Sequence, residues 1–130
     1  MRLQGLEGLT FNDSLTKSLS LETRNELDIG AEVDRVYLHV PDQLILTTGP
    51  DSPKISITKS DTFSDVVFWN PWIEKAKAMA DFGDEEVCLV FFIDKKYQKM
   101  VCVEAGAVSK DVVLEPGCSW TGSQVLRVLD

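Results

Sequence analysis

Short segments of alternating apolar and polar residues, separated by glycine and proline turns, are the feature that most constrains this 130-residue chain. In the clearest of them, Lys54–Lys59, Ile55 and Ile57 alternate with polar neighbours, and Val33–Val40 alternates in the same way. A period of two places successive side chains on opposite faces of a strand. Regular short strands with little helix predict a mainly β protein, an antiparallel β-sandwich, and residues 1–130 are enough for one domain with a sizeable core.

The remaining strands are expected on the same grounds. Residues 2–13 read as a strand, a turn and a strand around two glycines, whereas residues 14–25 are expected to form an irregular connection or a frayed strand pair. On the strand Val33–Val40, Asp34 shares a face with Val36, Leu38 and Val40. Further strands are predicted over residues 44–48, 66–69, 100–104, 112–114 and 124–129.

One short helix is expected near residues 71–80. Asn70 can accept a hydrogen bond from an N–H group of the first turn, and Pro71 loses nothing there by lacking its own N–H. Gly83 can adopt the left-handed conformation that ends a helix. Trp69 and Trp72 flank the Asn-Pro pair and could form a flat, half-polar wall for a sugar, although such residues more often pack in a core.

Composition excludes several kinds of function. The formal net charge of −8 argues against nucleic acid and anionic membrane surfaces as partners. The cysteines Cys88, Cys102 and Cys118 fit neither a Cys-x-x-Cys pattern nor a closed disulfide set, which favours a reducing compartment. No signal peptide, membrane-spanning run, metal constellation or phosphate-binding glycine loop is apparent, so a cytoplasmic protein without metal or cofactor is expected.

Several motifs in order resemble the glucose-6-phosphate 1-epimerase (hexose-6-phosphate mutarotase) branch of the aldose 1-epimerase family. The motifs run along nearly the whole chain: Gly5-Leu-Glu-Gly8, Val33-Asp-Arg-Val-Tyr37, Trp69-Asn-Pro-Trp72, Lys77-Ala-Met-Ala-Asp-Phe-Gly-Asp-Glu-Glu86, Met100-Val-Cys-Val-Glu-Ala-Gly106, Glu115-Pro-Gly117 and Trp120-Thr-Gly122. Members of that branch are typically more than twice as long, and the chain resembles their C-terminal half. The resemblance implies a large antiparallel sandwich, present here in part, and a hexose 6-phosphate substrate.

The resemblance also suggests roles for three residues. Anomer interconversion needs a base for the proton of the anomeric hydroxyl and an acid for the ring oxygen. Glu104 matches the family's base, although an exposed strand-end carboxylate is the simpler explanation from the residues alone. Asp34 matches an Asp that hydrogen-bonds sugar hydroxyls, with Arg35 or the backbone as an alternative partner. Trp72 is a candidate for sugar stacking.

Other parts of the family's site have no counterpart. The single histidine, His39, does not match the catalytic His, which lies upstream of Gly5-Leu-Glu-Gly8 in the family. The arginines Arg2, Arg24, Arg35 and Arg127 match none of the phosphate-binding motifs. The chain is therefore expected to be inactive alone, and a non-catalytic β-sandwich module that binds carbohydrate or protein is the alternative.

One segment departs from the family pattern. Val87–Lys96 intervenes where relatives run from Asp-Glu-Glu directly to Tyr, and its first seven residues are apolar. We interpret it as an insertion. Such a run without Pro or Gly favours aggregation on a sheet edge, so self-association of the chain is expected.

Overall fold

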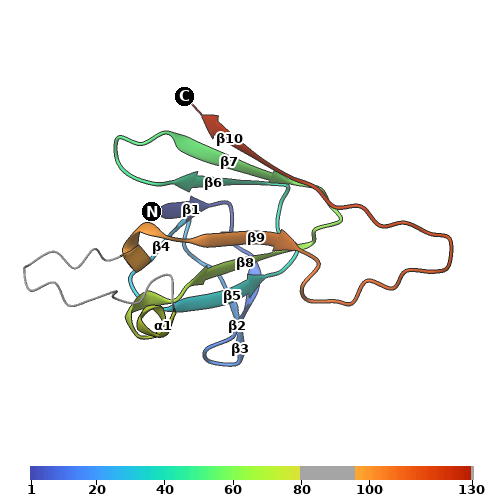
Figure 1. The fold of residues 1–130 in the computed structure, drawn as a ribbon, viewed down its shortest axis with the longest axis horizontal. Coiled ribbons are helices and arrows are strands. Elements are labelled where there is room, and N and C mark those ends of the chain that lie inside the picture. Colours follow the sequence, from blue (N-terminus) through green and yellow to red (C-terminus); the bar gives the residue numbers. More distant parts are fainter. Residues whose placement is uncertain (80–95, 130) are drawn as a thin grey trace, which may run out of the picture.

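The computed structural model describes residues 1–79 and 96–129, which form two five-stranded antiparallel sheets (Figure 1). The first sheet has the strand order β10-β7-β6-β1-β4. Its strands are β1 (Arg2–Gln4), β4 (Glu26–Asp28), β6 (Gln43–Thr47), β7 (Lys54–Lys59) and β10 (Gln124–Leu129).

The second sheet has the order β3-β2-β5-β8-β9 and carries every residue proposed to bind sugar or catalyse except Trp72. Its strands are β2 (Thr10–Asp13), β3 (Ser18–Leu21), β5 (Val33–Tyr37), β8 (Asp65–Asn70) and β9 (Cys102–Gly106). A helix, α1 (Trp72–Ala78), and a 3-10 turn, η1 (Lys96–Lys99), complete the described elements. The prediction of a mainly β antiparallel sandwich with one short helix is confirmed, and neither described helix is long and apolar enough to cross a bilayer.

The core is formed by the inward rows of both sheets. Tyr37 and Phe68 from the second sheet meet Leu3, Leu27 and Leu44 from the first, and all five are at most 2% exposed. Burying each such side chain stabilises the fold by roughly 1.5–3 kcal/mol relative to exposure. Ile57 lies in this core and Ile55 packs against it, as their alternation predicted.

The prediction of which side chains share a face is correct within β5 and wrong for Val40, which follows the strand. Val33, Arg35 and Tyr37 form the inward row, and Asp34 and Val36 form the outward row. His39 then adopts a positive φ of 52°, which breaks the alternation. Val40 consequently turns inward and is buried, although strict alternation placed it with Asp34.

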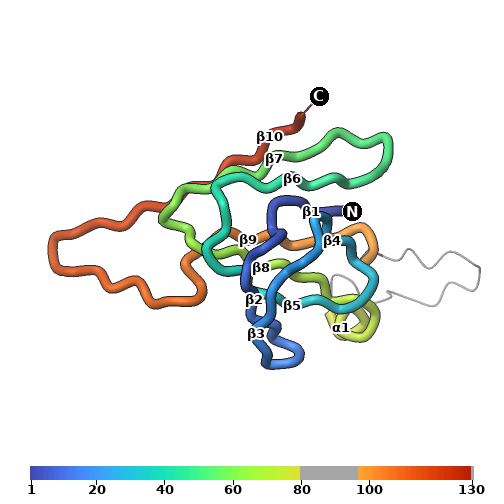
Figure 2. The backbone as a smooth tube through the Cα atoms, turned by 180° about the vertical axis from the view of Figure 1, so that it is seen from behind, coloured from blue at the N-terminus to red at the C-terminus, as the bar shows by residue number. Residues whose placement is uncertain are grey.

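Residues 112–114, predicted to be a strand, form no strand in the structure. They belong to a long arm, residues 107–123, that extends away from both sheets in the two views of Figures 1 and 2. Val113 is 80% exposed, because no neighbouring strand offers it hydrogen bonds or an apolar face. Both ends of the arm are fixed. Asp65 accepts hydrogen bonds from the N–H groups of Val108 and Ser109, and Trp120 packs on Phe63 with the ring centres 5.6 Å apart.

The fully buried side chain of Asn70 ties α1 and the segment entering β9 to the end of β8. Its Oδ1 accepts a hydrogen bond from the N–H of Trp72 at 2.7 Å, as expected for Asn70, but the helix begins at Trp72 and Pro71 is its cap residue, not its first helical residue as predicted. Its Nδ2 donates to the carbonyl oxygens of Tyr97 at 2.6 Å and Met100 at 2.7 Å. The helix ends at Ala78 and Met79 is already extended, so Gly83 does not end it, and Gly83 lies outside the described residues.

We expect Asn70→Ala to destabilise the fold by about 2–4 kcal/mol, because it leaves one N–H and two carbonyl groups without their partner. Asn70→Asp keeps the acceptor but loses both donated bonds, and it should be at least as damaging. Urea unfolding measures the effect. Gln98→Ala, at an exposed position of η1, is the control and should change stability by less than about 0.5 kcal/mol. Equal stability of Asn70→Ala and Gln98→Ala would contradict the assignment.

Candidate functional site

Asp34 and Glu104 lie on the same outward face of the second sheet, on the two strands that flank β8. The register pairs Asp34 with Trp69, and it pairs Val67 with Glu104. Directly opposed residues point to the same side of a sheet. Asp34 and Glu104 therefore share one face, although 70 residues of sequence separate them.

Two rows of side chains make up this face, which we call the β5–β8–β9 face. One row consists of Asp34, Trp69 and Cys102, and the next consists of Val36, Val67 and Glu104. With strands about 4.8 Å apart and about 3.3 Å per residue, the Cα atoms of Asp34 and Glu104 lie roughly 12 Å apart. That separation leaves room for a sugar ring between the two carboxylates, above an apolar centre.

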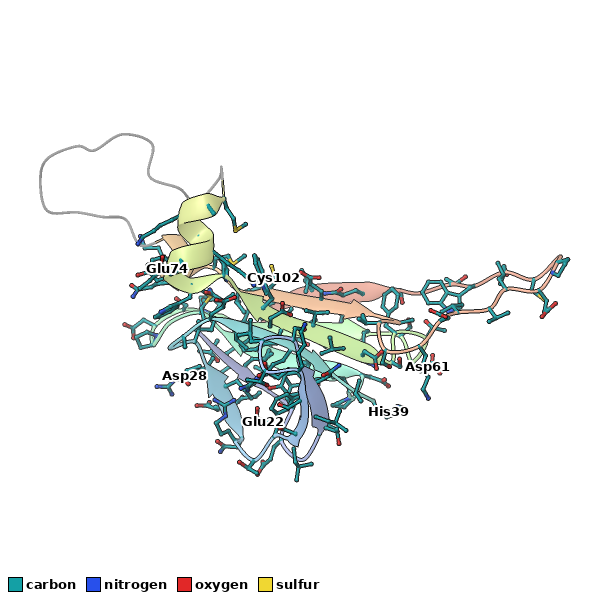
Figure 3. All side chains as sticks on the ribbon, turned by 90° about the horizontal axis from the view of Figure 1, so that it is seen from below. Glu22, Asp28, His39, Asp61, Glu74 and Cys102 are labelled. Carbon is teal, nitrogen blue, oxygen red and sulfur yellow. The ribbon has the colours of Figure 1, made fainter. Side chains whose placement is uncertain are left out.

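The β5–β8–β9 face is open to solvent over the described residues. Glu104 is exposed, and Asp34, Trp69 and Cys102 are half-buried. Helix α1 borders the face near Cys102, as Figure 3 shows. Lys75 of this helix forms an ion pair with Glu32 at 2.6 Å, just before β5. The hydrogen bond to Glu32 is the main cause that raises the pKa of Lys75, and the negative charge of Asp34 makes a smaller contribution in the same direction.

Trp72, the residue predicted to stack on sugar, stands at the start of α1 and not on the strand row. Its backbone has a positive φ of 54°, which is unusual for a bulky residue. Its ring packs edge-on against Tyr97 with the ring centres 5.0 Å apart. A sugar contact for Trp72 stays a prediction, whereas Trp69 lies directly between Asp34 and Cys102.

Cys102 is a residue of this face that sequence reasoning did not assign to the site. Burial raises the pKa of its thiol, and the adjacent Glu104 raises it further. The thiol therefore stays protonated at neutral pH and presents a weak S–H donor beside the proposed base. The signal that could have identified Cys102, and distinguished Trp69 from Trp72, is the period of two, counted across paired strands instead of along one strand.

A buried ionic network supports β5 from the opposite side. The hydroxyl of Tyr37 donates to the Oε2 of Glu22 at 2.7 Å, and Arg24 donates to the Oε1 of Glu22 at 2.8 Å. Arg35 donates to the Oδ2 of Asp13 at 3.0 Å, and its guanidinium lies 4.4 Å from the centre of the Phe11 ring. Arg35 thus has its partner in Asp13 on the inward side, and it does not pair with Asp34.

Glu22 is the most strongly perturbed carboxyl of this network. Burial alone would raise its pKa, but hydrogen bonds from Arg24 and Tyr37 outweigh burial and lower the pKa to about 2. The same burial, with the Glu22 hydrogen bond, raises the pKa of Tyr37 well above its ordinary value. Glu22 is therefore ionised and Tyr37 neutral across the physiological range.

The proton donor and phosphate clamp that the family uses have no candidate among the described residues of the β5–β8–β9 face. His39 is exposed beyond the end of β5, far from Cys102 in Figure 3. Arg24 and Arg35 bind Glu22 and Asp13, and Arg2 pairs with Glu26. In the ranges 1–79 and 96–129, no three His, Cys, Asp or Glu side chains gather in a way that could hold a metal ion.

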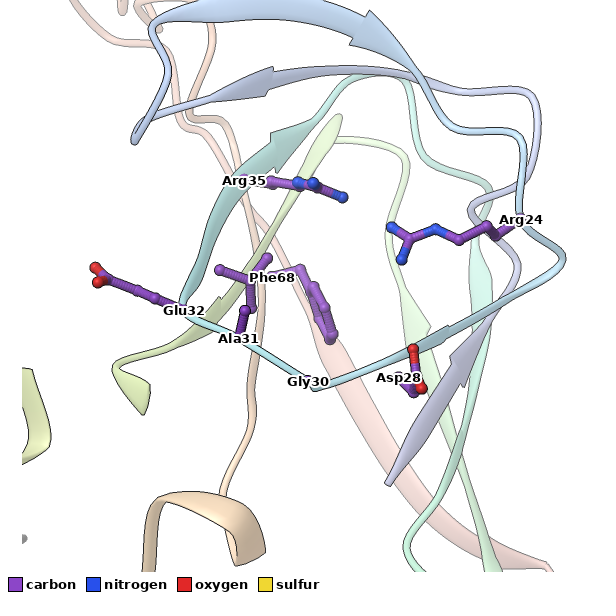
Figure 4. A pocket seen from close by; sticks show the side chains of 8 residues that line it. Arg24, Asp28, Gly30, Ala31, Glu32, Arg35 and Phe68 are labelled. Atoms are coloured by element: carbon purple, nitrogen blue, oxygen red, sulfur yellow. The ribbon is translucent and has the colours of Figure 1, made fainter. Parts of the chain in front are cut away.

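A cavity of about 240 Å³ opens on the other side of β5, away from both predicted carboxylates. Arg24, Asp28, Arg35 and Phe68 line it together with the backbone near Gly30 (Figure 4). Arg35 and Phe68 belong to the inward row, so this cavity cannot be reached by the side chains of Asp34 and Glu104. Its arginines are already neutralised by Glu22 and Asp13, which makes it a poor site for an anion.

Comparison with known proteins identifies the family of the chain. The family model for aldose 1-epimerase matches residues 1–127. The chain belongs to the aldose 1-epimerase family. It is 37% identical over 130 residues to a candidate glucose-6-phosphate 1-epimerase of Cenchrus ciliaris. The match covers 99% of this chain and 36% of that relative, so the chain spans about a third of the relative's length. The predicted family is confirmed, and the roles of Glu104, Asp34 and Trp72 stay predictions.

The inserted segment is the part of the sequence prediction that the structure does not reach. Residues 80–95 lie outside the described residues, so the insertion proposed for Val87–Lys96 can be followed only from η1 onward. At that point Tyr97 contacts Trp72, and the carbonyls of Tyr97 and Met100 bind Asn70. The chain thus returns from this segment directly to the border of the β5–β8–β9 face.

The depressed pKa of Glu22 predicts a loss of stability in acid. Its carboxylate stabilises the fold fully above its unfolded pKa near 4.5, and the stabilisation disappears as pH falls toward 2. The whole shift corresponds to about 3 kcal/mol, and about 2 kcal/mol is expected because the partner Arg24 is half-exposed. Glu22→Gln should lower stability by this amount at pH 7 and converge with the unmodified chain near pH 2.

Chemical denaturation between pH 2 and pH 7 tests this expectation. Glu7→Gln, at an exposed position, is the matched control and should follow the unmodified chain throughout. A constant difference between Glu22→Gln and the unmodified chain over the whole pH range would show that ionisation of Glu22 is not the cause.

Proposed function

We propose that this chain carries the base and sugar-binding part of a glucose-6-phosphate 1-epimerase-type site, which interconverts the α and β anomers of hexose 6-phosphates. The observation that carries the proposal is the shared face of Asp34 and Glu104, with Trp69 between their strands. Membership of the aldose 1-epimerase family and the name of the relative in Cenchrus ciliaris support it.

In this proposal Glu104 is the general base. It is exposed on the outward face of β9, where its carboxylate can reach the anomeric hydroxyl of a bound aldose. Removal of that proton, with protonation of the ring oxygen, opens the ring. Rotation about the bond to C1 and reversal of the two transfers then give the other anomer. The proposed reaction uses two proton transfers and no cofactor.

Asp34 and Trp69 have complementary tasks in this proposal. The carboxylate of Asp34 accepts hydrogen bonds from sugar hydroxyls, which orient the ring relative to Glu104. The indole of Trp69 supplies an apolar surface for the C–H groups of the sugar. Trp72, held by Tyr97 at the border, would contact the sugar only at its rim.

The described residues of the β5–β8–β9 face include no histidine, lysine or arginine that could act as the acid or bind the phosphate. Lys75, whose pKa Asp34 helps to raise, is already paired with Glu32. A residue from beyond this face must therefore protonate the ring oxygen, and other cations must bind the phosphate. The chain by itself is accordingly proposed to be inactive.

A non-catalytic module that binds carbohydrate or protein is the second candidate. The open, half-apolar face without an acid is the observation that favours it. The two functions differ in their dependence on Glu104, because proton abstraction needs the carboxylate whereas simple binding tolerates the amide.

The first functional test grafts residues 1–130 in place of the matching segment of an active full-length relative. In this chimera, Glu104→Gln should reduce anomerisation of glucose 6-phosphate by about two to four orders of magnitude, the usual contribution of a positioned base. Exchange NMR measures the rate. Glu115→Gln, an exposed carboxyl of the arm, is the control and should keep the rate of the chimera. Near-normal turnover in Glu104→Gln would refute the assignment of the base.

The second functional test uses the chain alone. We expect anomerisation at the rate of buffer, because the described β5–β8–β9 face supplies only the proposed base and not the acid. Saturation-transfer NMR should still detect weak sugar binding, and Asp34→Asn should weaken it several-fold through loss of charge-assisted hydrogen bonds. Acceleration by the chain that disappears in Glu104→Gln would show that no further acid is required. Sugar binding that is unchanged in Asp34→Asn and in Glu104→Gln would indicate that the sugar binds to a different surface, and it would favour the non-catalytic binding module.

A further inference from the structure

The outer edge of β10 is the longest unpaired strand edge in the described part of the chain. Among the described residues β10 pairs only with β7, through six residues from Gln124 to Leu129. The other edge strands, β3, β4 and β9, have four, three and five residues. The row of N–H and C=O groups on such an edge is a template for another strand.

The side chains of β10 do not protect this edge. Four of its six residues are apolar, and Leu126 and Val128 are 63% and 68% exposed. These two stand opposite Ile57 and Ile55, which face the core. The apolar inward row of the first sheet therefore continues past the sandwich onto β10, where no described strand covers it. Edge strands usually carry charges, prolines or bulges, and β10 has only Arg127.

β10 is also held ready to accept a strand. Its pairing with β7 is continuous over all six residues, and the chain just before it is fixed by two hydrogen bonds between Ser60 and Ser123. A preformed edge lowers the entropy lost when a further strand binds.

We propose that two copies of this chain associate through antiparallel pairing of their β10 strands, which joins the two first sheets into one ten-stranded sheet. Figure 1 shows β10 at the outer limit of the molecule, so another copy can approach it without meeting the second sheet. The proposal is independent of the epimerase function. It also assigns the expected self-association to β10, and not to the inserted segment Val87–Lys96.

Symmetry and charge determine the register. A two-fold axis perpendicular to the sheet keeps like faces together, so the pairing must centre on one residue facing its own copy. Only centres at Leu126 or Arg127 pair five residues of β10 in each copy. A centre at Arg127 places two guanidinium groups directly opposite each other, which destabilises the pair. The centre at Leu126 instead opposes Leu126 to itself, Val125 to Arg127 and Gln124 to Val128.

The strength and salt response of the dimer follow from the same surface. A single pair of six-residue strands is at the low end of specific interface sizes, so the dimer should dissociate on dilution in the micromolar range. Each copy carries a formal net charge of −8, and repulsion between copies opposes association. Salt screens this repulsion, and 0.5 M NaCl should therefore strengthen the dimer.

Size-exclusion chromatography with light scattering tests the proposal on the whole chain. At about 100 μM we expect a mass of twice 14.5 kDa that falls toward the monomer on dilution. Leu126→Arg places two cations face to face and should reduce dimerisation at least tenfold. Leu19→Arg is the matched control, since Leu19 is 68% exposed on the edge strand β3, and it should leave the dimer intact. Thermal unfolding confirms that both variants are folded.

Cross-linking tests the register. In a chain with Cys88→Ser, Cys102→Ser and Cys118→Ser, Leu126→Cys should form a dimer disulfide under mild oxidation, whereas Arg127→Cys should not. The reverse result would place the centre at Arg127 and overturn the register. A monomer at all concentrations, or association that persists unchanged in Leu126→Arg, would overturn the proposal and, in the second case, assign association to another segment.

Discussion

The pairing register of β5, β8 and β9 is the constraint on which the rest of the site depends. Because side chains alternate with a period of two, a slip by one residue on β5 would turn Asp34 into the core and Arg35 to the solvent. Both consequences are costly. Arg35 would lose Asp13, and Tyr37 would lose Glu22, leaving charged or polar groups buried without partners. The ionic network on the inward side thereby determines that Asp34, and not Arg35, stands on the outward face.

Much of this fold could be predicted from local patterns, since those patterns report on burial. Lys54–Lys59 and Gln124–Leu129 are strands with the predicted bounds, and Asn70 accepts the expected hydrogen bond from the first turn of the helix. The strand predicted over residues 112–114 is absent from the structure. An apolar triplet becomes a strand only where a partner edge exists, and the arm passes no such edge among the described residues. The predicted face of Val40 was wrong because the residue before it, His39, has a positive φ, which reverses the faces of the residues that follow.

The candidate site was predictable residue by residue through family resemblance, but not as an arrangement. Glu104 and Asp34 were found on their motifs, and Trp69 was named with Trp72 as a possible wall for a sugar, but only strand pairing placed Trp69 beside Asp34. Sequence favoured Trp72 because it stands at the same motif, and the structure shows its ring engaged with Tyr97. The partners that hold β5, Glu22 and Asp13, precede it by 11 and 20 residues or more, and no local signal links them to it.

The polarity of the second sheet limits where the proposed site can lie. Its inward row, with Tyr37 and Phe68, packs in the core, so the proposed sugar contacts belong to the outward row. The outward residues of β5, β8 and β9 include no histidine, lysine or arginine. We propose that the proton donor and the cations for the phosphate come from chain that lies over the β5–β8–β9 face, because the outward residues of the sheet beneath it supply no such cation or imidazole.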